Sequence, residues 1–145
     1  MASAVRERLP VIRQLDQLAG IARGDRATYL RYSLGPQADA RQTSRDYESG
    51  LELPGLSVVP LTPPGWWRRP VADWLARQVC KYAQLGEADA GRCAWILTGR
   101  EVGRGPDHEP LVADPHPLAI LSEGLVGQAR DHYHERFDVG RDSRS

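Results

Sequence analysis

The sequence PVADWLARQVCKYAQL, at residues 70–85, decides the fold together with AWILT at residues 94–98. In the first segment apolar side chains recur every three or four residues. This spacing predicts an amphipathic helix that begins at Pro70. The second segment is short, apolar and rich in residues that favour strands, and it predicts a central strand. A helix followed by a buried strand indicates a sheet with helices packed against it.

The segments on either side extend this arrangement. An amphipathic helix is expected over residues 11–22, and Ser122 can cap a final helix that ends near residue 136. Shorter runs with strand character lie at residues 28–33, 56–61, 111–112 and 118–121. The order of these elements predicts an α+β fold: a compact single domain over residues 1–137, with a small mixed or antiparallel sheet flanked by helices, and a polar tail at 138–145.

Two polar segments separate these elements, at residues 35–54 and 99–110. We expect both to be loops, because they contain few apolar residues and several glycines and prolines. A structureless stretch of about twenty residues is unusual inside a compact domain and is often functional or mobile. We therefore expect the functional residues to lie in these segments and in the strands beside them.

Composition excludes several classes of function. The chain has 19 basic and 19 acidic residues, and a net charge of zero gives no electrostatic attraction to nucleic acid, so no nucleic-acid partner is expected. No apolar run is long enough to span a membrane and no secretory signal is evident, so a cytoplasmic protein without membrane contact is expected. Cys80 and Cys93 match no zinc motif, and no metal site is expected. His132 and His134 are expected to face solvent.

Three polar residues have a more specific pattern. Arg31 lies in the strand segment YLRYS, Ser57 in GLSV, and Glu109 in DHEPLV, just before another strand. This order resembles the Arg-Ser-Glu set of the ADP-ribosyltransferase superfamily. The resemblance covers roughly residues 28–121, and Asp107-x-Glu109 matches the acidic element of that superfamily. It implies an ADP-ribosyltransferase-like fold and either transfer of ADP-ribose from NAD or NAD binding alone.

The resemblance also implies a role for each residue. Glu109 would stabilise the positive charge that develops on the ribose as the nicotinamide bond breaks, as carboxylates do in glycoside cleavage. Arg31 would hold a phosphate or the ribose through its planar fork, and Ser57 would orient the nicotinamide end. Asp107 would face the acceptor, and the indole of Trp66 or its neighbour would cover the adenine or nicotinamide.

Some features depart from that superfamily. Only Leu56-Ser57-Val58 stands where the arginine-modifying branch has Ser-Thr-Ser, the acidic residue is Asp107, and Pro110 directly follows Glu109. The chain from end to end also resembles an uncharacterised family of small proteins from high-GC Gram-positive bacteria. The segments RYSLGPQADA, SRDYESGLELPGLSV and LTGREVGRGPDHEPLV carry that likeness, which implies no established activity.

Other interpretations of the same residues stay open. Arg31 could form an ordinary ion pair with Asp39 or Glu48, with Ser57 and Glu109 as surface groups. The protein could be a non-enzymatic interaction or regulatory protein whose partner contacts the polar loop and the Trp66-Trp67 pair. A third possibility is an enzyme that acts on an RNA phosphate or a nucleotide.

Overall fold

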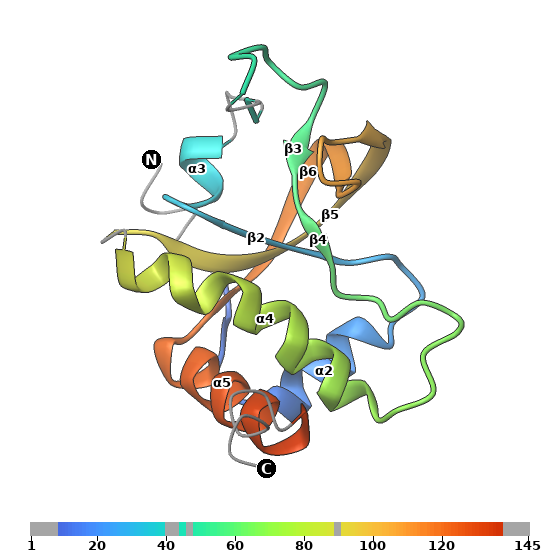
Figure 1. The fold of residues 1–145 in the computed structure, drawn as a ribbon, viewed down its shortest axis with the longest axis vertical. Helices are drawn as coiled ribbons and strands as arrows, with labels where there is room; N and C mark the ends of the chain where they lie inside the picture. Colours follow the sequence, from blue (N-terminus) through green and yellow to red (C-terminus); the bar gives the residue numbers. More distant parts are fainter. Residues whose placement is uncertain (1–8, 40–43, 46–47, 89–90, 138–145) are drawn as a thin grey trace.

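The protein folds as an α+β domain with a curled, mixed sheet and four helices (Figure 1). The computed structural model describes residues 9–39, 44–45, 48–88 and 91–137, and of residues 82–88 only the backbone. Its elements are β1 (Val11–Ile12), α2 (Leu15–Ala22), β2 (Tyr29–Ser33), α3 (Pro36–Asp39), β3 (Leu56–Ser57), β4 (Val59–Pro60), α4 (Val71–Ala88), β5 (Cys93–Arg104), β6 (Pro110–Leu121) and α5 (Glu123–Phe137). The polar tail at 138–145 lies outside the described residues.

The sheet has the strand order β1-β6-β5-β2-β4, and β3 also pairs with β6. Among the strand pairs of the described residues, β1–β6 is parallel and the others are antiparallel. Residues 56–60 thus contact both ends of the path β6-β5-β2: β3 pairs antiparallel with β6, and β4 pairs antiparallel with β2. The sheet must curl strongly for one short segment to do this.

Irregularities in the long β5–β6 hairpin account for the curl. The pairing register shifts at three places, and shifts of this kind bend a strand and increase its twist. Asp114 has a positive φ of 52° in this region. Opposite it, a Cβ on Gly99 would lie 2.9 Å from the carbonyl oxygen of Ala113, so only glycine allows the two strands to approach this closely.

Two hydrophobic clusters fill the fold. The main core lies between the sheet and α2, α4 and α5, which are grouped on one side of it (Figure 1). The second core lies within the curl and consists of Tyr29, Leu56, Val58, Trp95, Leu97 and Val112. Alternation along β2 divides its residues between the two: Leu30 and Tyr32 contact the main core, whereas Tyr29 belongs to the second.

The structure confirms several predicted elements. The helix expected at 70–85 is α4, the strand expected at 28–33 is β2, and α5 begins after Ser122, whose Oγ accepts a hydrogen bond from the Leu125 backbone N–H at 3.0 Å. The strand expected at 56–61 is present as β3 and β4. No helix in the described residues is apolar and long enough to cross a bilayer.

Three predictions of elements were wrong in their bounds or in their type. The helix expected over 11–22 begins only at Leu15, because the β-branched pair Val11–Ile12 forms a strand beside β6. The loop expected at 99–110 is strand as far as Arg104, and the strands expected at 111–112 and 118–121 are one continuous β6. The loop expected at 35–54 contains the short helix α3 and an isolated bridge between Arg45 and Glu52.

Candidate functional site

A short hydrogen bond joins Ser57 and Glu109. Ser57 ends β3, and Glu109 is the last residue of the turn between β5 and β6. The Ser57 Oγ donates to the Glu109 Oε2 at 2.6 Å, a distance typical of a charge-assisted hydrogen bond from a hydroxyl to a carboxylate. The Ser57 backbone N–H donates to the Ser44 Oγ at 2.7 Å. Ser57 is therefore held through both its backbone and its side chain.

Glycine lets β3 come close enough to β6 for this contact. A Cβ on Gly55 would lie within 3.0 Å of three backbone atoms of Val112. Backbone atoms cannot move aside cheaply, so a side chain at Gly55 would push β3 away from β6. The position of Ser57 therefore depends on Gly55, two residues before it.

The β5–β6 turn fixes the Glu109 carboxylate. The Gly105 backbone N–H donates to the Glu109 carbonyl at 2.8 Å, and His108 adopts a positive φ of 62°. The carboxylate folds back over the turn, where its Oε1 accepts the Asp107 backbone N–H at 3.0 Å. A Cβ on Gly105 would lie 2.4–2.6 Å from the carboxylate atoms, so the carboxylate occupies the space that a side chain would fill.

Glu109 is in its charged form at neutral pH. Partial burial alone would raise the pKa of its carboxyl group, but hydrogen bonds outweigh this effect and lower the pKa. The donors are the Ser57 hydroxyl and the backbone N–H groups of Glu109 and Asp107, and the charge of His108 adds to them. The result is a partly exposed carboxylate, fixed in orientation, that can accept further hydrogen bonds from a ligand.

Arg31 contacts the same serine from the other side. Its Nη1 donates to the Ser57 carbonyl at 2.7 Å and to the Ser44 Oγ at 3.3 Å. Its Nε donates to the Asp39 Oδ2 at 2.7 Å, and its Nη2 is 3.5 Å from the Asp39 Oδ1. A guanidinium has five N–H donors. Because four hydrogen bonds are made within the protein, little of the fork is free for a phosphate.

The Arg31–Asp39 ion pair connects this site to the second core. Asp39 is buried and also accepts the Ser33 hydroxyl, which in turn accepts the indole N–H of Trp95 at 3.1 Å. A buried carboxylate needs such partners, because an unpaired charge in the interior is costly. The members of this connected set, the Arg31 network, are Trp95, Ser33, Asp39, Arg31, Ser44, Ser57 and Glu109.

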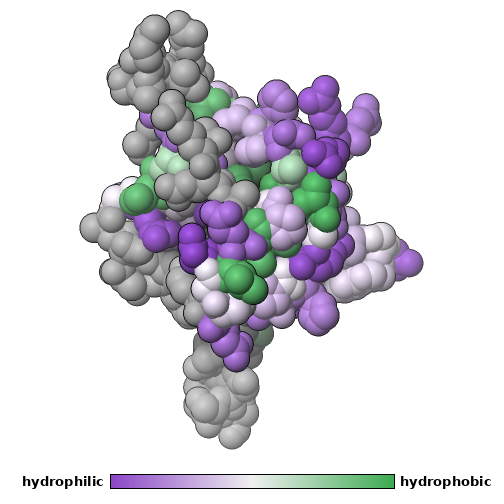
Figure 2. Space-filling view, turned by 90° about the horizontal axis from the view of Figure 1, so that it is seen from above, coloured by the Kyte–Doolittle hydropathy of each residue, from purple (hydrophilic) through white to green (hydrophobic). Residues whose placement is uncertain are grey.

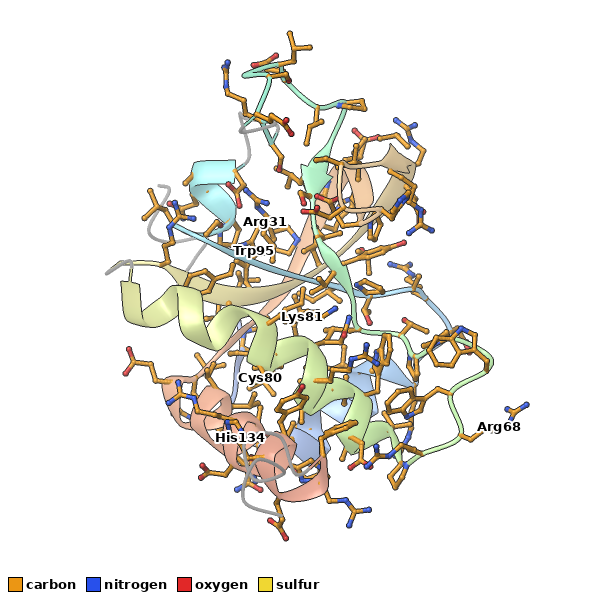
Figure 3. The ribbon with its side chains drawn as sticks, in the orientation of Figure 1. Arg31, Arg68, Cys80, Lys81, Trp95 and His134 are labelled. Carbon is orange, nitrogen blue, oxygen red and sulfur yellow. The ribbon has the colours of Figure 1, made fainter. Side chains whose placement is uncertain are left out.

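The structure brings Arg31, Ser57 and Glu109 together. Asp107 lies on the same turn as Glu109 and is exposed. Trp66 lies elsewhere, in the loop before α4, and is 67% exposed. Figure 3 shows Arg68 of that loop well separated from Arg31. The indole of Trp67 packs against Trp74 at 5.1 Å between ring centroids, so the two neighbouring indoles have different environments.

Sequence reasoning missed several of these contacts. It named Asp39 as a possible partner of Arg31, but nothing in the sequence indicates Ser44. The glycine-rich turn was visible, although the role of Gly105 beneath the carboxylate was not. His132 was wrongly expected to face solvent: its Nε2 lies 2.8 Å from the buried Asp73 Oδ1. The described residues contain no cluster of three or more His, Cys, Asp or Glu side chains that could hold a metal ion.

Comparison with known proteins gives a family but no activity. A family of unknown function, DUF6098, matches residues 5–144. No curated protein and no solved structure matches the chain. A function has therefore to be inferred from the residues of this chain.

Proposed function

We propose that this chain, which belongs to the DUF6098 family of unknown function, is an ADP-ribosyltransferase-like domain that binds NAD at the Ser57–Glu109 pair. One observation carries the proposal: the Ser57 hydroxyl donates to the Glu109 carboxylate while the Ser57 carbonyl accepts from Arg31. These are the three residues whose order in the sequence resembles the Arg-Ser-Glu set. Their contact across the fold supports that likeness independently of their order.

The chemistry suits a fixed carboxylate. Transfer from NAD breaks the bond between the ribose C1 and the nicotinamide nitrogen, and nicotinamide leaves with the bonding electrons. Glu109 is charged at neutral pH. It would stabilise the positive charge that develops on the ribose and would accept a hydrogen bond from a ribose hydroxyl. The C1 atom then bonds to a nucleophile of the acceptor, which loses its proton. Asp107, which is exposed on the same turn, would face the acceptor.

Arg31 takes a different role from the one expected from the resemblance. Its guanidinium is engaged by Asp39, Ser44 and the Ser57 carbonyl. We therefore assign it as a positioning residue that holds Ser57, and through it Glu109, rather than as the main phosphate ligand. An Arg31→Lys variant keeps the charge but cannot form the fork. It should lower the melting temperature even without NAD.

The test combines binding and turnover. NAD at a hundred times its Kd should stabilise the folded protein by about 2.7 kcal/mol, which a thermal-shift assay detects. Release of nicotinamide, followed by chromatography, should fall at least about a hundredfold in Glu109→Gln, the scale seen when one stabilising group of a transition state is removed. Glu123→Gln is the matched control, because Glu123 is an exposed glutamate at the start of α5. Equal release by both variants, or no thermal shift with NAD, would refute the proposal.

A second variant separates position from charge. In Gly105→Ala the new Cβ would displace the Glu109 carboxylate, which is the flexible end of a side chain and can move at little cost in stability. Nicotinamide release should therefore fall while the melting temperature changes little. Full activity in this variant would mean that nicotinamide release does not require the orientation of the carboxylate or its contact with Ser57.

The exposure of Trp66 favours a second candidate function. A large indole that is 67% exposed is unusual, and tryptophan is among the residues that most often anchor protein interfaces. The protein could therefore act as a non-enzymatic interaction or regulatory protein through this loop. The polar segment 35–54, part of which lies outside the described residues, was expected to join the same surface.

A further inference from the structure

A basic and aromatic surface lies beside the loop that precedes α4. It consists of Trp66, Arg68, Arg77 and Lys81, all exposed, and is named here the α4 patch. Figure 3 shows Arg68 at the outer edge of the loop, projecting away from the domain, and Lys81 along α4. This surface is separate from the Arg31 network, which lies around β3 and the β5–β6 turn.

Ring contacts connect the exposed indole to α4. The indoles of Trp66 and Trp67 have centroids 6.2 Å apart, and Trp67 packs edge-on against Trp74 at 5.1 Å. The guanidinium of Arg77 lies 5.9 Å from the centre of the Trp74 ring, which is itself buried. Lys81 follows Arg77 by four residues, so both lie on one face of the helix. The exposed indole is therefore linked through buried rings to the face of α4 that carries the two cations.

The cations of this surface are not neutralised. Arg68, Arg77 and Lys81 have no acidic partner within 4.0 Å in the part of the chain that the structure describes, whereas Arg31, Arg69, Arg100 and Arg104 all do. Partial desolvation, and after it the nearby charge of Arg77, lowers the pKa of Lys81. Like charges four residues apart destabilise a helix unless something offsets them.

We infer that the α4 patch binds an acidic segment of a partner protein, with Trp66 as the apolar anchor and Arg68, Arg77 and Lys81 facing its carboxylates. This inference rests on the second candidate function and names the chemistry of the partner. An acidic segment offsets the repulsion along α4 and buries the indole, which are the two costs that the free protein carries.

A peptide suits the patch better than a nucleic acid or a membrane does. Proteins that bind single strands present several aromatic platforms along a basic groove, whereas this patch has one exposed indole and three cations. The net charge of zero gives no long-range attraction to a polyanion. Hydrophilic residues and small, separate hydrophobic patches share the face seen in Figure 2, which includes no broad apolar surface among the described residues.

The test uses a fluorescein-labelled peptide of ten residues with alternating glutamate and leucine, and a second peptide with glutamine in place of glutamate. Fluorescence anisotropy with the full chain should show binding of the acidic peptide that weakens as salt is added. Trp66→Ala should weaken binding about tenfold or more, and Arg77→Gln combined with Lys81→Gln should reduce the salt dependence. Arg100→Gln, an exposed arginine paired with Asp114, is the matched control and should bind like the wild type.

Each alternative outcome has a distinct meaning. If both peptides bind equally and both need Trp66, the interaction role stands but the acidic partner is refuted. If Trp66→Ala binds as the wild type does, the inference and the second candidate function both fail. Tighter binding of a ten-nucleotide thymidine strand, or of phosphatidylserine vesicles, than of the acidic peptide would overturn the choice of a protein partner. None of these results bears on NAD binding at Ser57 and Glu109.

Discussion

Replacement of Asp73 by asparagine should destabilise the protein more than any comparable exchange at its surface. The Asp73 side chain is 1% exposed and sits between α4 and α5, the most closely associated pair of helices. Its Oδ1 lies 2.8 Å from the His132 Nε2 and 3.4 Å from the Arg136 Nε, and its Oδ2 lies 3.2 Å from the Arg69 Nε. Asp73→Asn keeps the shape of the side chain but removes the charge that these groups surround.

The size of the effect follows from burial. Breaking a buried ion pair costs about 3–5 kcal/mol, because the partner left behind is unpaired. Here the partner side chains are 28–48% exposed and can be rehydrated, so the expected loss is about 1.5–3 kcal/mol. For a domain of this length about 1 kcal/mol corresponds to roughly 3–4 °C, and the melting temperature should fall by roughly 5–10 °C.

Chemical denaturation of the variant beside Asp114→Asn provides the assay. Asp114 pairs with Arg100 at 3.1 Å, but its side chain is 74% exposed. Its loss should change the free energy of unfolding by less than about 0.5 kcal/mol, and asparagine tolerates the positive φ at this position. If Asp73→Asn is as stable as Asp114→Asn, the carboxylate does not hold α4 and α5 together, and the reasoning from burial is refuted.

Three further predictions concern the site and its supports. Folding lowers the pKa of Glu109, so the charged carboxylate stabilises the folded protein fully above the unfolded pKa of about 4.5. This stabilisation is lost as the pH falls through the folded pKa. The difference in unfolding free energy between wild type and Glu109→Gln should therefore shrink as the pH falls below about 4.5 and stay constant above about pH 6. Gly55→Ala should lower stability by at least about 2 kcal/mol in urea denaturation, whereas Gly65→Ala, whose Cβ would meet nothing within 4 Å, should not; similar stabilities would contradict the close approach of β3 to β6. Ser122→Ala should cost about 1 kcal/mol through loss of the α5 cap, and Ser122→Asp should restore it.

Local signals in the sequence account for the elements that were predicted well. The helix α4 has a regular apolar stripe and a proline just before it, and α5 has a serine cap, so neither depends on distant partners for recognition. The strand β2 is rich in residues that favour strands, and its side chains alternate between the two cores. Each of these patterns lies within one helix or one strand, so it predicts the element whatever the topology of the fold.

Contacts between distant segments account for the errors. β6 was predicted as two pieces, at residues 111–112 and 118–121, and between these lie Pro115 and Pro117, which lack the N–H that a regular ladder needs. The hairpin tolerates them because its register shifts at three places. Likewise, Val11–Ile12 is a strand only because Ile120–Leu121 lies beside it. No rule about neighbouring residues could supply either pairing.

The candidate site was predicted in part. The resemblance to the ADP-ribosyltransferase superfamily named Arg31, Ser57 and Glu109, and the structure joins them. The sequence did not show that Asp39 and Ser44 would take most of the hydrogen bonds of Arg31, because both lie in a segment predicted to be loop. Which groups accept the N–H donors of Arg31 depends on where the segment 35–54 passes the sheet, and composition alone does not predict that path.

The curl of the sheet is what makes the three residues neighbours. β2 and β6 are separated by β5, and Arg31 is in register with Trp95, nine residues before the Arg104 that pairs with the start of β6. In a flat sheet Arg31 and the start of β6 would therefore lie about 30 Å apart, with Ser57 at one edge only. Because residues 56–60 pair with β6 and then with β2, Ser57 lies between the two and hydrogen-bonds both Arg31 and Glu109. The same closure encloses the second core, and Trp95 of that core donates to Ser33 in the Arg31 network. The packing that stabilises the curl therefore also sets where Ser57 lies relative to Arg31 and the β5–β6 turn, so a substitution that changes the second core should also move this site.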